Sequence, residues 1–143
     1  MKKLFLLLFS TTCFLSAFSN PPAHGYDYSI VFTGWFKNDV ISLKINNTTI
    51  FENYVLDNSN EKNAGNLSLT QTAKGLTIFY NNQEKLVSQL EIEFFLDVTI
   101  TINKEARHFK VDLRKGRIVL VNCPGASGTK ELCIEQIEEP VVF

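Results

Sequence analysis

The sequence predicts an all-β protein: a two-sheet antiparallel β-sandwich of about eight or nine strands, immunoglobulin-like or jelly-roll-like in architecture. Apolar and polar residues alternate with a period of two along most of the chain, which is typical of half-buried strands. Helical periodicity behind a capping residue is almost absent. The 12 Phe residues can fill the space between two sheets, whereas 143 residues are too few to enclose a large ligand cavity as well.

Turn sequences separate the alternating segments. Asn46-Asn47 and Asn81-Asn82 favour tight hairpin turns, because Asn tolerates the positive φ angles that such turns require. Lys74-Gly75 separates two further short strands. The expected strand segments are, in order, residues 26–32, 40–45, 49–56, 66–70, 76–80, 90–102, 108–114, 118–121 and 131–137, with 141–143 as a further edge segment.

The longest alternation, from Leu90 to Ile102, predicts a curved central strand whose even-numbered residues face the core. Residues 108–114 alternate next, and a two-residue turn at Lys115-Gly116 leads into another strand. These three strands form a meander in the predicted fold. With residues 103–106 as the first connection, the apolar faces match in three facing pairs: Ile100 with Phe109, Val98 with Val111, and Leu96 with Leu113.

The outer face of this meander carries apolar residues beside a cation. The same register places Phe95 opposite Arg114, with Val119 and Val121 on the neighbouring strand. An apolar centre with a charged rim is typical of contact surfaces, and aromatic and Arg side chains are their usual energetic anchors. These four residues are therefore candidate ligand-binding residues. The alternative is that a loop or terminal strand covers them as a second layer of core.

A pair of acidic residues on that face is a weak candidate for metal binding. The register places Asp97 opposite Asp112, and like charges that face each other across strands are destabilising unless something neutralises them. Lys110 and Arg114 flank Asp112 and favour a salt-bridged surface patch. The remaining interpretation is a bound metal ion or a cationic ligand group.

Trp35 and Phe36 lie between two expected strands and form a second candidate ligand site. A flat aromatic ring can cover the face of a sugar, and Trp35 is the single Trp of the chain. An aromatic pair beside a strand end is more commonly buried in the core. Both interpretations stay open on the sequence alone.

The first 19 residues have the features of a bacterial signal peptide that is removed after Ser19. Lys2 and Lys3 precede an apolar stretch at residues 4–14, and small residues occupy the positions that a signal peptidase recognises. A membrane span would need about 20 continuous apolar residues, whereas this stretch is shorter and interrupted. We therefore expect export to the periplasm or the extracellular space.

Export leaves a flexible leader at residues 20–25 and a single β-sandwich domain at residues 26–143. The apolar fraction of 45% and the charged fraction of 20% are those of an ordinary globular domain. Lys and Arg number 14 against 15 Asp and Glu, so the net charge of −1 gives no long-range field for nucleic acid or an anionic membrane. We expect neither nucleic-acid binding nor a membrane span.

Two cysteines, Cys123 and Cys133, are left after removal of the signal peptide. They flank a short loop that contains Pro and Gly, and they would lie in an oxidising compartment. We therefore expect a disulfide between two neighbouring strands. Closing a loop of this size would stabilise the fold by roughly 3 kcal/mol.

The sequence shows no catalytic constellation. His24 lies in the leader and His108 on the polar face of a strand, so neither is framed by a nucleophile and a carboxylate. The leading hypothesis is an exported, non-catalytic binding or adhesion module of the cell envelope, with a protein or carbohydrate ligand and no cofactor. The alternative is a small carboxylate-dependent hydrolase that uses Glu91, Glu93 or Asp97, although the two Glu side chains point the same way along one strand.

Overall fold

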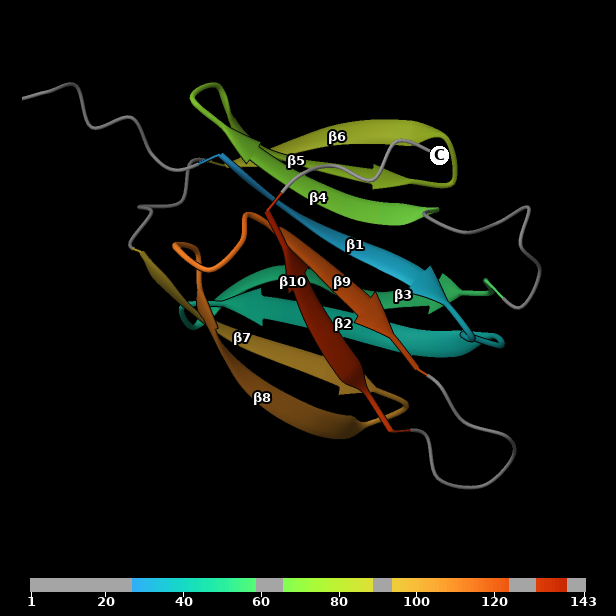
Figure 1. Ribbon diagram of the computed structural model, residues 1–143. Coiled ribbons are helices and arrows are strands. Elements are labelled where there is room, and N and C mark those ends of the chain that lie inside the picture. Colours follow the sequence, from blue (N-terminus) through green and yellow to red (C-terminus); the bar gives the residue numbers. More distant parts are fainter. Residues whose placement is uncertain (1–26, 59–65, 89–93, 124–130, 139–143) are drawn as a thin grey trace, which may run out of the picture.

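The structure, a computed structural model, describes residues 27–58, 66–88, 94–123 and 131–138. It contains two β-sheets and no helix in these ranges, which confirms the predicted all-β sandwich. The larger sheet has the strand order β10-β9-β1-β4-β5-β6 and the smaller has the order β3-β2-β7-β8 (Figure 1). The strands are β1 (Tyr28–Gly34), β2 (Asp39–Ile45), β3 (Thr48–Leu56), β4 (Leu67–Thr72), β5 (Gly75–Tyr80), β6 (Gln83–Ser88), β7 (Phe95–Ile102), β8 (Glu105–Asp112), β9 (Ile118–Asn122) and β10 (Cys133–Ile137).

Several predicted segments lie outside the described residues. They are the signal peptide and leader, residues 90–93 of the expected long strand, and the edge segment at 141–143. Phe94, which the alternation assigns to the core, lies at a bend just before β7 and is 45% exposed, so that assignment is wrong. Across the part of the chain that is described, no helix is long and apolar enough to cross a membrane.

Paired asparagines form two of the hairpin turns, as predicted. Asn46 and Asn47 have φ angles of 47° and 64° between β2 and β3. Asn81 and Asn82 have φ angles of 48° and 60° between β5 and β6. Because both central residues of each turn lie in the left-handed region, these turns match the right-handed twist of the flanking strands.

A third tight turn changes the expected register of β7 and β8. Asn103 and Lys104 have φ angles of 49° and 77°, and they replace the expected connection at residues 103–106. The facing pairs are therefore Val98 with Phe109 and Leu96 with Val111, so the predicted pairs are wrong by two residues. Because side chains alternate with a period of two, this shift keeps Val111 on the inner face, where it is buried.

The chain leaves the smaller sheet after β8 instead of turning back beside it. β9 pairs in parallel with β1 and antiparallel with β10, so the predicted three-stranded meander is wrong. Gly116 lies in this crossing, and a Cβ atom there would come within 2.9 Å of the carbonyl oxygen of Ile137. The crossing thus depends on a close approach between its backbone and that of β10.

The core lies between the two sheets, and apolar side chains from both sheets fill it. A row of aromatic rings runs through one part of this core. Its ring centroids are 5.9 Å apart for Phe32 and Phe36, 6.4 Å for Phe32 and Phe51, 4.6 Å for Phe51 and Tyr54, and 4.5 Å for Tyr54 and Tyr80. Because these rings come from both sheets, they help to hold the two layers together.

The expected disulfide between Cys123 and Cys133 is absent from the structure. Cys133 lies opposite Asn122 in the β9–β10 pair, one residue away from the position that would face Cys123. Successive residues of a strand point to opposite faces of the sheet. The buried thiol of Cys123 and the exposed thiol of Cys133 therefore point to opposite sides, which is why the predicted bond does not form.

Candidate functional site

Phe94, Phe95 and Arg114 lie together at one end of the smaller sheet and are called here the aromatic–arginine cluster. The guanidinium carbon of Arg114 is 4.8 Å from the ring centroid of Phe95 and 6.0 Å from that of Phe94. Phe95 is 52% exposed. An exposed cation–π contact of this kind stabilises by about 0.5–1 kcal/mol. The sequence predicted Phe95 and Arg114 as a pair, and the structure brings them into contact.

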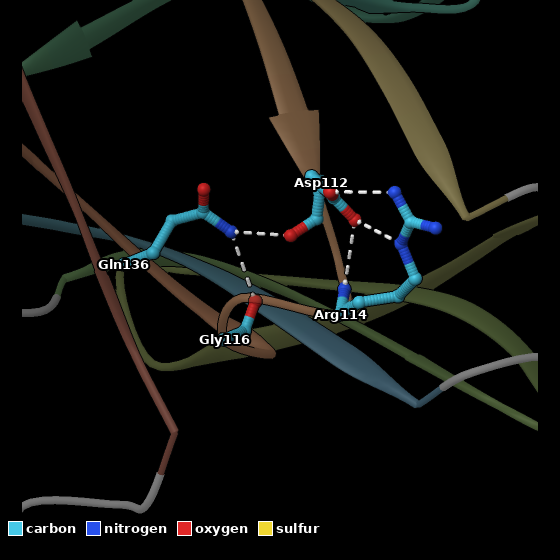
Figure 2. A network of polar contacts seen from close by, with 4 residues as sticks. All are labelled: Asp112, Arg114, Gly116 and Gln136. Atoms are coloured by element: carbon cyan, nitrogen blue, oxygen red, sulfur yellow. Dashed lines mark hydrogen bonds and ion pairs between the residues drawn. The ribbon is translucent and has the colours of Figure 1, made fainter.

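A bidentate ion pair with Asp112 fixes the side chain of Arg114 (Figure 2). Its Nε donates to Oδ1 of Asp112 and its Nη2 to Oδ2, both at 2.8 Å. The backbone N–H of Arg114 also donates to Oδ1 of Asp112, at 3.1 Å. The side-chain hydrogen bond from Arg114 is the main reason that the pKa of Asp112 is lowered to about 2, with smaller contributions from the backbone hydrogen bond and from nearby positive charge, against an opposing effect of desolvation.

Gln136 ties this end of the smaller sheet to β10 of the larger one. Its Nε2 donates to the carbonyl oxygens of Asp112 and Gly116, each at 3.0 Å (Figure 2). Leu113 is also fixed, because its N–H donates to the carbonyl of Phe94 at 2.8 Å. The segment that carries Arg114 is therefore bonded to both sheets.

Val119 and Val121, the other two predicted residues of this surface, are buried in the core. They were assigned to the outer face because β9 was expected to turn back beside β8 in the same sheet. The crossing places β9 in the opposite sheet, where its odd-numbered residues face inward. The assignment of Val119 and Val121 to an exposed outer face is therefore wrong.

The two candidate metal ligands do not face each other. Asp97 lies opposite Lys110, and Asp112 lies opposite Phe95, because of the two-residue shift in register. The carboxylate of Asp112 is already bonded by Arg114 through both oxygens. Among the described residues there is no group of three His, Cys, Asp or Glu side chains that could hold a metal ion.

A shallow hollow adjoins the aromatic–arginine cluster on the outer face of the smaller sheet. Its volume is about 540 Å³, and its lining residues are Asn46, Asn47, Phe95, Asp97 and Lys110. A second hollow of about 380 Å³ shares three of these residues and also involves Thr99 and His108 of the same two strands. The two hollows together are called here the β7–β8 hollow.

Some polar groups of the β7–β8 hollow are bonded to one another and others are not. Asn46 accepts a hydrogen bond from the N–H of Asp97 through its Oδ1, at 2.9 Å, and Thr99 Oγ1 lies 2.9 Å from His108 Nδ1. The side chains of Asn47, Asp97 and Lys110 make no hydrogen bond or ion pair within the described ranges. These three groups are therefore open to a ligand.

Trp35 and Phe36 separate in the structure, with one ring outside and one inside. Trp35 is 66% exposed and has a φ angle of 69°, which is unusual for a bulky residue. Phe36 is fully buried, and its carbonyl accepts a hydrogen bond from the N–H of Asn58 at 2.9 Å. Trp35 precedes β2, whereas Phe95 begins β7, which pairs antiparallel with β2. The two candidate sites therefore lie at opposite ends of that sheet.

The remaining catalytic candidates do not gather into a site. His108 is exposed and its ring nitrogen lies beside a Thr hydroxyl, with no carboxylate on its other side among the described residues. Glu91, Glu93 and His24 lie outside those residues. The chain matches no protein-family model, and comparisons with curated proteins and with solved structures likewise gave no match.

Proposed function

We propose that the chain is a non-catalytic binding or adhesion module that uses the outer face of its smaller sheet. The observation that carries this proposal is the aromatic–arginine cluster, in which two exposed Phe rings flank a fixed guanidinium. Exposed aromatic and Arg side chains are frequent energetic anchors of binding surfaces. Because Asp112 already fixes the Arg114 side chain, this side chain would lose little conformational entropy when a partner binds it.

The expected signal peptide at residues 1–19 supports a location in the periplasm or outside the cell. A partner in that setting is a protein or a carbohydrate of the cell envelope. Neither class of partner requires a cofactor from this chain.

The binding module is better supported than a small hydrolase. A glycosidase of the common type holds two carboxyl groups about 5–9.5 Å apart across a cleft. Of the carboxylates that this alternative would use, Glu91 and Glu93 lie outside the described residues, and Asp97 lies opposite a Lys in a shallow hollow. Such an arrangement is better suited to binding a ligand than to catalysis by two carboxyl groups.

Binding to a glycan array and to a panel of envelope proteins tests this function. Replacing Phe95 with Ala should weaken binding to the true partner by more than about 1 kcal/mol, because it removes the exposed anchor while the core stays intact. Phe79→Ala is the matched control, since Phe79 is an exposed Phe on the other sheet. A partner that binds both variants equally well would place the binding surface elsewhere.

A further inference from the structure

We infer that the β7–β8 hollow binds a neutral oligosaccharide. This inference rests on the proposed function, because Phe95 belongs to both the aromatic–arginine cluster and the lining of the hollow. It goes further by selecting one class of ligand from the chemistry of the lining residues.

The open polar groups of the hollow suit sugar hydroxyls. A carboxylate only accepts hydrogen bonds, an ammonium group only donates them, and an amide does both. Asp97, Lys110 and Asn47 supply one of each around the same hollow. A sugar hydroxyl both donates and accepts, so a single saccharide can satisfy all three groups.

The charges of the hollow favour a neutral ligand. Asp97 and Lys110 face each other across β7 and β8, and their formal charges cancel. An anionic ligand would meet the Asp97 carboxylate, and a cationic ligand would meet the Lys110 ammonium group. An uncharged ligand with many hydroxyls avoids both of these repulsions.

Phe95 supplies the apolar part of the hollow. An exposed aromatic ring can cover the C–H face of a pyranose while polar groups bind its rim. The contact with Arg114 limits the movement of the Phe95 ring, so little freedom is lost when a sugar stacks on it.

The rest of the outer face fits a saccharide better than a protein. The centres of protein–protein interfaces are depleted in charged side chains. Along β7 and β8 most of the outward residues beyond Phe95 are instead polar or charged, with Ala106 as an exception: Asp97, Thr99, Thr101, His108 and Lys110. The volumes of about 540 and 380 Å³ also fall in the range of about 300–1,000 Å³ of small-ligand sites.

Titration of the ¹⁵N-labelled protein, followed by NMR, tests this inference. The neutral probes are cellotetraose, tetra-N-acetylchitotetraose, mannotetraose and xylotetraose, with tetragalacturonate as the charged comparison, each up to about 10 mM to detect a Kd of about 1 mM. We expect at least one neutral probe to shift the amide signals of Asn47, Phe95 and Lys110. Tetragalacturonate should bind more weakly.

Matched substitutions assign the binding to the hollow. Phe95→Ala, Asp97→Ala and Lys110→Met should each weaken binding of the neutral saccharide by about tenfold, because each removes one contact from a shallow site. Phe79→Ala, Glu84→Ala and Lys85→Met are the controls. These three side chains are exposed on β5 and β6 of the larger sheet and do not line the hollow, so their replacement should leave binding unchanged.

The two proposals fail in different ways. A protein partner whose binding depends on Phe95, together with no response to the neutral saccharides, would overturn this inference and leave the proposed function standing. Stronger binding of tetragalacturonate, or saccharide shifts confined to Trp35 and its neighbours, would also overturn it. If no glycan or envelope protein depends on Phe95, the proposed function fails as well.

Discussion

At the scale of single residues, the carboxyl group of Asp112 titrates well below its ordinary range because of Arg114. The hydrogen-bonded guanidinium stabilises the charged carboxylate, and the pKa falls from 3.8 to about 2. A lowered pKa in the folded state means that this group adds stability above pH 3.8 and loses that contribution as the pH falls toward 2. The contribution of this ion pair is therefore the same in mildly acidic as in neutral solution.

Replacing Arg114 with Ala should return the pKa of Asp112 toward 3.8. NMR titration of the side-chain carboxyl carbon measures this change directly. Arg107→Ala is the control, because Arg107 pairs with Glu105 at an exposed position and does not touch Asp112. If the Asp112 pKa stays near 2 in the Arg114 variant, another group is responsible for the shift.

Phe95 and Arg114 were predictable as neighbours from the sequence, although their contact differs from the one expected. In the β7–β8 pair, Asp112 and not Arg114 lies opposite Phe95. Arg114 contacts the Phe95 ring because its side chain is long enough to reach it. Phe94 was missed because its alternation with Leu96 hides the bend that turns it outward. Val119 and Val121 were misassigned because their facing depends on which sheet holds β9, a non-local property that local alternation does not encode.

At the scale of secondary-structure elements, Asn pairs made two hairpins predictable, while the Asn103-Lys104 turn was missed. Lys rarely adopts a positive φ angle, so this pair gave a weaker turn signature than Asn-Asn. At Lys115-Gly116 the error was the opposite, because a hairpin was expected where the structure has none. The segment instead leads from one sheet to the other, and the absence of a side chain at Gly116 lets the backbone of β10 lie close to it.

Gly116→Ala should destabilise the protein by about 1–3 kcal/mol, because the added methyl group overlaps the backbone of Ile137 and forces a shift. Urea denaturation measures the change in the free energy of unfolding. Gly34→Ala is a matched control, since a Cβ atom there has nothing within 4 Å. Equal stability of the two variants would show that β10 does not approach the crossing closely.

At the scale of the whole molecule, the sandwich was predictable because period-two alternation and turn composition are local properties. The distribution of strands between two sheets was not, since pairing partners such as β1 and β9 lie far apart in the sequence. The inward face of β8 was still assigned correctly, because the error in register was an even number of residues.

Val111→Asp should prevent folding, because Val111 is buried between the sheets and an unpaired charge there is costly. Thermal unfolding monitored by circular dichroism provides the measurement. Val55→Asp is the control, since Val55 is half-exposed and should accept the same substitution with little loss. A normal unfolding transition for the Val111 variant would contradict the inward position of this residue.

The parallel pairing of β1 with β9 also determines when the larger sheet can be completed. β1 lies in the middle of that sheet, between β4 and β9, and β9 is held in turn by β10 near the other end of the described chain. During synthesis, one edge of β1 therefore waits unpaired until nearly all of the strands have been made. Such long-range pairing folds slowly and late. The part of the larger sheet formed by β1, β4, β5 and β6 can therefore pair first, and β9 and β10 complete the sheet only at the end.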